Sequence, residues 1–233
     1  VFLVVKLPAV HVLSQLTLPS QVKLSGVSGT IWQGKAQQVS YMGLPLENVN
    51  WSLSALPLIW GEVSTDIKGG NLRQAEQIAL NGHISASQTA ISAQDLTAYI
   101  PADIAMTVLP LPIPVQAEGR FKVNLTDLDY DYATGCNQLS GDGQWLNAKV
   151  AGVNKLIDLG SFKAGLGCEK QQVLVKVKQP NSLGLDAQVN LPADMKFTVS
   201  GRFKPADSLP KEVHQAALFF GNKGSDGYYP IKF

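Results

Sequence analysis

The sequence predicts a mainly β protein, built as two stacked or fused curved antiparallel sheets from an internal duplication, with two or three short helices. Three observations predict this fold class. Short runs of alternating apolar and polar residues fill most of the chain, glycines and prolines separate these runs, and several short words recur in the same order in the second half. With 233 residues, 45% of them hydrophobic, the chain is long enough to bury a substantial core.

The N-terminal segment combines an apolar run with a short predicted helix. The run Val1–Val5 is too short to cross a bilayer, which takes about 20 residues. It is therefore either the end of a membrane-spanning helix or a buried strand. Beyond it, Val10, Leu13 and Leu16 recur at three-residue spacing, which predicts a helix over Ala9–Leu18.

From Val22 onward the pattern is that of strands. The predicted strand regions are residues 22–67, Ile78–Ala93, Phe121–Tyr132, Gln144–Val153, Gln171–Val177 and Lys196–Phe203. Two other segments have helical spacing. Asp95–Ile100 is long enough for one turn only, whereas Ala206–Phe220 predicts a true helix that Gly221 ends.

Three short words recur in the second half. Leu24-Ser25-Gly26 followed by Trp32 recurs as Leu139-Ser140-Gly141 followed by Trp145, the eight residues from Pro101 recur from Pro192 with five identities, and Gly119-Arg120-Phe121-Lys122 recurs as Gly201-Arg202-Phe203-Lys204. The matches are collinear, which favours a duplication over chance recurrence of short words. Two copies of one antiparallel unit are the architecture that this predicts.

Charge and cysteine content exclude some functions. The formal net charge is +1 and basic residues form no long run, so nucleic acid is excluded as a partner. Cys136 and Cys168 are the two cysteines and belong to no CxxC motif, so a structural disulfide fits them better than a metal site; two reduced buried thiols are the alternative. A disulfide would imply an oxidising compartment.

One glycine-rich segment resembles a phosphate-binding loop without meeting its requirements. Gly29–Ala36 matches G-x-x-x-x-G-K, but Ala36 stands where the loop needs Ser or Thr to hold magnesium. The residues that follow alternate as a strand, whereas the loop requires a helix N-terminus there. We therefore predict a β-hairpin, with Trp32 packed on a face of the sheet.

Three aspartates at period two form a candidate cation site. If they lie in one strand, Asp127, Asp129 and Asp131 would share a face. Phe121, Val123 and Leu125 would precede them on that same face. The spacing of an EF-hand is missing, so we favour a solvated end of a strand over a cation site. The buried side chains at this end would then be those of the opposite face, Leu128, Tyr130 and Tyr132.

Catalytic motifs are missing from the sequence. His11, His83 and His214 occur singly and belong to no metal-binding motif, and no G-x-S-x-G nucleophile elbow or dinucleotide fingerprint is present. We therefore expect a protein that is not an enzyme and uses no cofactor and no metal.

The four tryptophans are the candidate interaction residues. Trp32, Trp51, Trp60 and Trp145 all fall in predicted strand regions. They either pack in the core or line an apolar face of a curved sheet, where they would contact lipid or the strand edge of a partner.

The segment Leu24–Ala36, LSGVSGTIWQGKA, resembles the signature of protein N of the bacterial type II secretion system. In that family the signature follows soon after a single N-terminal membrane helix. Leu7-Pro8-Ala9, Leu44-Pro45-Leu46 before the Trp51 strand, two cysteines in the second half and a short helix near the end agree with the resemblance.

The resemblance implies a non-enzymatic component of type II secretion, anchored in the inner membrane with its bulk in the periplasm. Its partners would be other secretion subunits and, through a helix absent from this chain, the inner membrane; a lipid-binding or lipid-transfer domain is the alternative, since the family resembles AsmA-like proteins with curved sheets. Four segments are then predicted: the remnant of the membrane anchor plus a short helix at 1–20, the first β repeat at 21–118, the second with the disulfide at 119–204, and a C-terminal helix and tail at 205–233.

Overall fold

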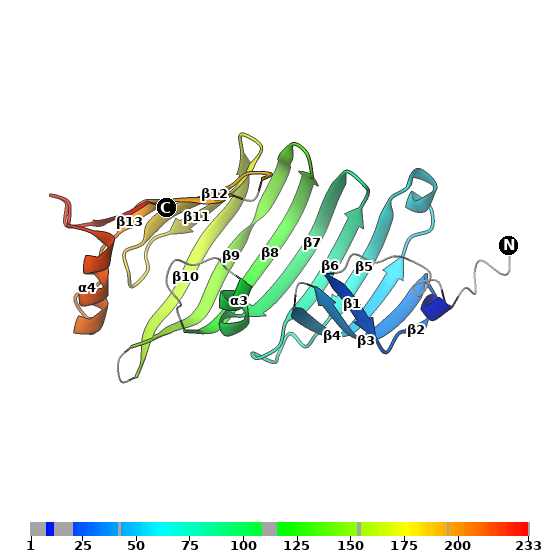
Figure 1. The fold of residues 1–233 in the computed structure, drawn as a ribbon, viewed down its shortest axis with the longest axis horizontal. Helices are drawn as coiled ribbons and strands as arrows, with labels where there is room; N and C mark the ends of the chain where they lie inside the picture. Colours follow the sequence, from blue (N-terminus) through cyan, green and yellow to red (C-terminus); the bar gives the residue numbers. More distant parts are fainter. Residues whose placement is uncertain are drawn as a thin grey trace.

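The computed structural model describes residues 8–11, 21–41, 43–108, 116–152, 155–194 and 196–232. The predicted role of Val1–Val5 therefore lies outside the described residues, as does most of the helix expected over Ala9–Leu18, of which residues 9–11 are helical. The described chain forms one antiparallel sheet that runs the length of the molecule, with a few short helices beside it (Figure 1).

The strands follow one another in chain order. They are β1 (Val22–Ser25), β2 (Ser28–Gly29), β3 (Gln33–Tyr41), β4 (Leu44–Leu53), β5 (Val63–Gly69), β6 (Ala79–Ala86), β7 (Ala90–Pro101), β8 (Ala117–Asp131), β9 (Gly135–Ala151), β10 (Leu156–Glu169), β11 (Gln172–Lys178), β12 (Asp186–Leu191), β13 (Thr198–Phe203) and β14 (Tyr229–Lys232). The helical elements are η1 (Pro57–Trp60), α3 (Ala102–Val108), α4 (Lys211–Ala217) and η2 (Leu218–Phe220).

The sheet is a single meander of 14 strands. Each strand from β3 to β13 pairs with the next one in sequence, while β1 and β2 both pair with β3. In the described part of the chain β1 and β14 are the two ends of the sheet and do not pair with each other, so the sheet is not closed. The mainly β, antiparallel prediction is confirmed. Of the two arrangements expected, stacked or fused sheets, stacking is wrong for the described residues, whose strands form one continuous sheet. Long strands continue the hydrogen-bonded ladder through the middle of the molecule, and β8 itself contains the predicted boundary at 118/119.

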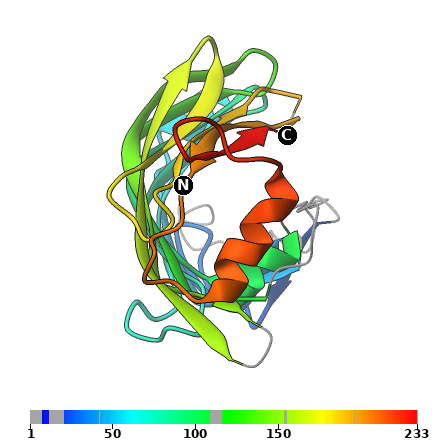
Figure 2. The same cartoon turned by 90° about the vertical axis from the view of Figure 1, so that its left-hand side faces the viewer.

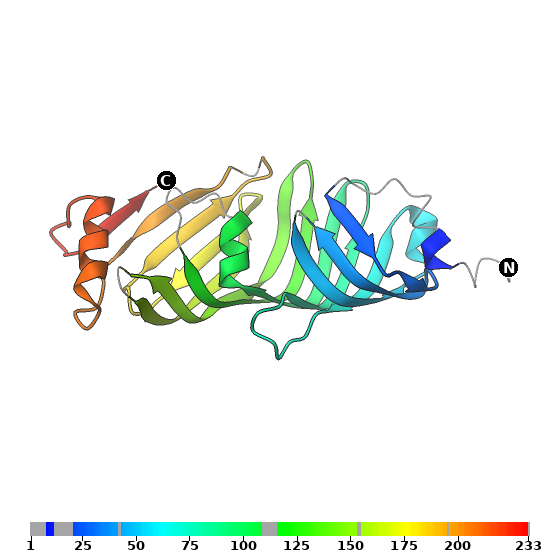
Figure 3. The same ribbon diagram turned by 60° about the horizontal axis from the view of Figure 1, so that its bottom comes forward.

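The sheet is strongly curved. Seen along the long axis it wraps around one side, and α3 and α4 lie on that concave side (Figures 2 and 3). Register shifts interrupt the pairing of β6 with β7, β8 with β9, and β9 with β10. An extra residue bends the strand that carries it and increases its twist, so these irregularities account for curvature that a flat ladder would lack.

The two faces of the sheet differ in polarity. Across seven successive strands, one row of paired residues reads Leu96, Leu125, Gly141, Leu166, Val175, Val189 and Val199. The neighbouring row, which points to the other face, reads Thr97, Asn124, Asp142, Gly165, Lys176, Gln188 and Ser200. We call the two sides the apolar face and the polar face.

The apolar face is the concave one. Leu209 and Val213, at the start of the α4 region, pack against the buried cluster that contains Phe162, and Phe162 shares its face with Leu166. Most apolar-row side chains are only half-buried, because no second sheet covers them. The core is therefore one layer thick over much of the molecule, unlike the two packed layers of an ordinary domain.

Two helix predictions have different outcomes. The turn expected at Asp95–Ile100 is wrong, because these residues belong to β7, where Asp95 adopts a positive φ of 47° at an irregular position. The helix expected within Ala206–Phe220 is confirmed in part: α4 begins only at Lys211, directly after Pro210, and continues into η2.

The recurring words do not adopt matching structures throughout. The residues from Pro101 enter α3, whereas those from Pro192 form a turn that leads into β13. By contrast, the words that begin at Gly119 and Gly201 both lie in strands, β8 and β13. The internal duplication and the four predicted segments therefore stay predictions.

Candidate interaction surfaces

Three aromatic rings line the concave side across β8, β9 and β10. Trp145 stacks between Phe121 and Phe162, with ring centroids 5.3 and 5.7 Å apart. Its indole Nε1 donates a hydrogen bond to the carbonyl of Glu118 at 3.0 Å. Trp145 thus packs against the buried cluster of the C-terminal half, as the core interpretation of the tryptophans expects.

The signature segment forms the predicted hairpin. β2 pairs with the start of β3, and the turn between them is held by Thr30, whose backbone N–H bonds the carbonyl of Gln33 at 2.9 Å. Gly26 and Gly29 take positive φ values of 63° and 85°, a region that favours glycine. A strand follows where a phosphate loop needs a helix, so the geometry is that of a hairpin.

The same hairpin is fastened to β4 through Trp51. The Trp51 Nε1 donates to the carbonyl of Ile31 at 3.0 Å, and the ring lies over Gly34, where any Cβ would overlap it. The carbonyl of Trp32 accepts a hydrogen bond from the backbone N–H of Leu53 at 2.7 Å. The glycines of the signature therefore shape a small, tightly fastened corner of the sheet.

The four tryptophans do not form one surface. Trp32 and Trp51 belong to the signature corner, Trp145 lies in the aromatic stack several strands away, and Trp60 is 76% exposed in η1. Their role in interaction stays a prediction.

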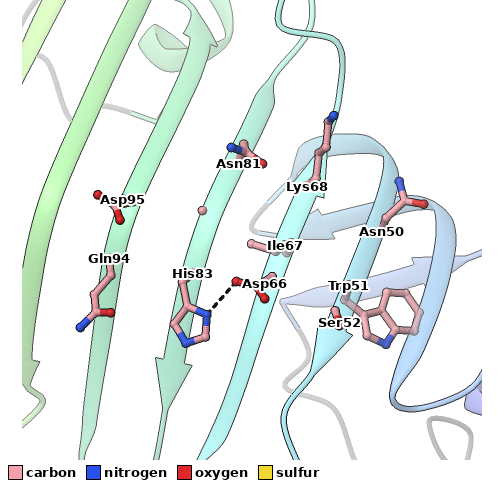
Figure 4. Close-up of a pocket in the computed structure, with 11 residues that line it drawn as sticks. Asn50, Trp51, Ser52, Asp66, Ile67, Lys68, Asn81, His83, Gln94 and Asp95 are labelled. Atoms are coloured by element: carbon pink, nitrogen blue, oxygen red, sulfur yellow. Dashed lines mark hydrogen bonds and ion pairs between the residues drawn. The ribbon is translucent and has the colours of Figure 1, made fainter.

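A shallow polar pocket lies over β4 to β7, with a volume of about 530 Å³ (Figure 4). At its edge Asp66 Oδ1 contacts His83 Nδ1 at 2.9 Å, and His83 Nε2 lies 2.8 Å from the hydroxyl of Ser64. This is the connectivity of a Ser-His-Asp triad. Sequence analysis missed it because the residues come from two neighbouring strands, with no motif linking them.

The serine of this arrangement does not have the setting of a catalytic nucleophile. Ser64 is buried, with only 6% of its surface exposed, and its hydroxyl also accepts a hydrogen bond from Ser85 at 2.9 Å. β5 is paired with β6 along its length and with β4 from Thr65 to Lys68, which leaves it a regular central strand instead of the sharp turn that exposes a catalytic serine. The four side chains serve as a polar link between β5 and β6.

The three aspartates of β8 do not share a face with the apolar residues before them. A register shift between Leu125 and Asp127 inserts one residue, so the expectation that Phe121, Val123 and Leu125 begin the aspartate face is wrong. Among the described residues no group of three or more His, Cys, Asp or Glu side chains could hold a metal ion.

Asp131 instead closes the β8–β9 turn. Its Oδ1 accepts hydrogen bonds from the backbone N–H groups of Thr134 and Ala133 and from the Thr134 hydroxyl. The bond from the Thr134 backbone is the main reason that the Asp131 pKa lies below its usual value.

Arg120, which the sequence marks only as part of a recurring word, has a structural role. It is 9% exposed, stacks on the Tyr99 ring at 4.2 Å, and donates from Nη1 to the carbonyl of Leu72 and from Nη2 to that of Gln77. Burial lowers its pKa. Arg120 therefore holds the segment between β5 and β6 against the sheet.

The predicted disulfide is confirmed. Cys136 at the start of β9 and Cys168 near the end of β10 are bonded, with Cα atoms 5.7 Å apart. The pairing of β9 with β10 ends at Gly141 and Leu166, so the bond joins the two strands beyond their last paired residues.

The two edge strands are short. β1 and β14 have four residues each, and β14 contains Pro230. Proline has no N–H to offer a partner strand, which is one way in which proteins protect a sheet edge. Extension of the sheet at β14 is therefore disfavoured.

Comparison with known families decides the family of the chain. The sequence model of the family described as type II secretion system (T2SS), protein N, matches residues 20–232. The chain belongs to this family. The structure thus belongs to a component of the type II secretion system, a structural part of that machinery and not an enzyme.

Three curated relatives, each called type II secretion system protein N, are similar over most of their length. The chain is 28% identical to the one from Vibrio cholerae, covering 98% of this chain and 90% of the relative. It is 27% identical to the one from Aeromonas hydrophila, covering 100% and 92%, and 26% identical to the one from Klebsiella pneumoniae, covering 94% and 84%. No solved structure matches. Within the described ranges, the helices are all too short or too polar to cross a membrane.

Proposed function

We propose that this chain is the periplasmic part of an inner-membrane-anchored component that contributes to the export of folded exoproteins across the outer membrane. The family match over residues 20–232 carries the proposal. The Cys136–Cys168 disulfide supports the periplasm, because disulfides persist in oxidising compartments such as the bacterial periplasm.

Its mechanism is contact with other secretion subunits through the concave face of the sheet. That face offers a long row of half-buried apolar side chains, whereas the β14 edge has only four residues and contains Pro230. Exposed apolar surface is the usual mark of an interaction site on a soluble domain. We retain Trp51 and Trp145 as candidate contact residues on this face. Trp32, in the signature corner, and Trp60, in η1, stay candidate interaction residues that we do not assign to it.

Adjacent residues of β11 allow a matched test. A photo-crosslinking residue at Val175 would project from the apolar face, and one at Lys176 from the polar face of the same strand. In cells of the source bacterium, we expect adducts with secretion subunits from Val175 and few from Lys176. A probe at Trp32 would report on the signature corner. Equal labelling from both β11 positions, or no subunit adducts at all, would remove the proposal.

A lipid-binding or lipid-transfer domain is the second candidate. It is favoured by the continuity of the apolar row from β7 to β13 on a curved sheet that no second sheet covers. Phospholipid in native mass spectra of the purified chain, combined with lipid instead of protein adducts at Val175, would transfer the assignment to this candidate.

We also propose that the sheet arose by duplication, with units at 21–118 and 119–204. In both copies of the Gly-Arg-Phe-Lys word the basic side chains lie over a tyrosine: Arg120 and Lys122 at 4.2 and 5.7 Å from the Tyr99 ring, Arg202 and Lys204 at 4.6 and 5.9 Å from the Tyr228 ring. An alignment of the two units in many members of the family tests this proposal. If the recurring words do not align between the two units of the other members, the proposal is contradicted.

A further inference from the structure

The turn between β4 and β5 is one of the two most exposed apolar segments of the described chain; the other is η2. Leu56, Ile59 and Trp60 are 71%, 73% and 76% exposed, and Leu58 reaches 36%. Residues 53–61 carry no charged side chain. Such a cluster disfavours solubility, so its presence on the surface indicates a contact.

The turn is preformed. Pro57 starts η1, and Gly61 closes it with a positive φ of 76°. Inside it the N–H groups of Ile59, Gly61 and Glu62 donate to the carbonyls of Leu56, Leu58 and Pro57, each at 3.1 Å. The apolar side chains are thus presented on a rigid support, which reduces the entropy lost on binding.

We propose that this turn inserts into the interfacial region of a phospholipid bilayer. Its internal hydrogen bonds satisfy three carbonyls, and Pro57 has no N–H, so little backbone desolvation opposes insertion. Leucine and isoleucine suit the acyl boundary, and tryptophan is enriched at membrane interfaces. A protein partner is the competing occupant, but residues 53–61 carry no charged side chain to orient it by charge complementarity.

The position of the turn in the chain is consistent with contact to a bilayer. β4 and β5 follow β3 toward the β1 end of the sheet order, and β1 is the strand that comes next in sequence after the segment for which we propose a membrane anchor. In this respect the inference rests on the proposed function. Because the turn itself is uncharged, binding is driven by apolar burial and does not require anionic lipid.

The test uses the purified 233-residue chain with vesicles of phosphatidylcholine and with vesicles that also contain phosphatidylglycerol. We expect partition into both kinds, with little effect of salt, and a drop of about tenfold for Ile59→Ser, since burial of one large aliphatic side chain accounts for roughly that factor. Phe219→Ser is the matched control, because Phe219 is 85% exposed near the opposite end of the sheet. The side chains of Ile59 and Phe219 are exposed, so both variants should keep the parent melting temperature.

A second readout locates the contact. Brominated acyl chains should quench part of the tryptophan emission of the parent chain, and Trp60→Phe should abolish that quenched part while Trp51 and Trp145 remain in place. The proposal is overturned by absent partition, by partition that needs phosphatidylglycerol, by an equal loss in Phe219→Ser, or by protein instead of lipid adducts at Ile59 in cells. Failure here leaves the subunit adducts at Val175 untouched, so the two proposals fail separately.

Discussion

The two halves of the sheet are built differently, although they share one continuous ladder. In the C-terminal half, long strands carry an aromatic stack, a disulfide and a covering helix, and both clusters of buried side chains in the described structure lie there. In the N-terminal half the buried residues are mostly alanines, and glycine turns and polar links hold the strands together. The comparison indicates that the C-terminal half supplies most of the stability.

Removal of the central ring of the C-terminal half should have the largest effect. Phe162 is 7% exposed and stacks on Trp145, so Phe162→Ala should lower the free energy of unfolding by about 4 kcal/mol. Val49 is the matched residue of the N-terminal half, fully buried in β4, and Val49→Ala should cost about 2 kcal/mol. Urea titration measures both changes. A larger loss from Val49 than from Phe162 would reverse the comparison.

Loss of the disulfide should come next. Replacement of Cys136 and Cys168 by serine should cost about 3 kcal/mol, somewhat below the chain-entropy value of about 3.7 kcal/mol for a loop of this size. Hydrogen exchange should accelerate first in β9 and β10, which the bond joins. A thiol assay on unfolded, unreduced parent protein provides the control, and two titrated thiols would remove the prediction.

The signature corner gives a smaller effect that is specific to the N-terminal half. Gly29→Ala combines a positive φ of 85° with a Cβ placed against the carbonyl oxygen of Gln33, so we expect a loss of about 2 kcal/mol. Gly43 has nearly the same φ, 86°, but nothing within 4 Å of its Cβ position. Gly43→Ala should therefore cost about 1 kcal/mol, and thermal unfolding should separate the two variants. Equal losses would show that backbone conformation alone matters at Gly29.

Sequence analysis predicted the parts of this fold that depend on local pattern. The alternation of apolar and polar residues gave the β class, and the glycine spacing gave the signature hairpin. The predictions failed where a single residue changes the register. The extra residue between Leu125 and Asp127 moves the aspartates to the other face of the sheet. In β7, Asp95 adopts a positive φ, which the periodicity of the sequence does not predict.

Side-chain contacts between neighbouring strands also could not be predicted from the sequence. The Ser64–His83–Asp66 chain depends on the register between β5 and β6, and the clamp of Arg120 depends on where the segment before β6 returns to the sheet. Whether the predicted units are stacked or fused stayed open for a related reason. A repeat in sequence predicts two units, but it does not distinguish stacking of the units from edge-to-edge continuation of one ladder.

Acid should weaken the turn that begins the C-terminal half, with the smallest effect of this series. The Asp131 pKa is lowered in the folded protein chiefly by the hydrogen bond from the Thr134 backbone. A carboxylate with a depressed pKa stabilises the fold above its unfolded pKa of about 3.9, and this contribution is lost as the pH falls through the lower, folded value. Stability of the parent chain should therefore fall more steeply with acid than that of Asp131→Asn.

The slope between neutral pH and the acid range, taken from urea midpoints, measures this difference. Thr134→Val removes the hydroxyl donor to Asp131 but keeps both backbone donors, so its slope should lie between those of the parent and Asp131→Asn. Because the carboxylate is exposed, the effect should stay well below that of the Gly29 substitution. Identical slopes in all three chains would mean that this turn adds no acid-sensitive stability, and the advantage of the C-terminal half would then rest on its apolar packing and its disulfide alone.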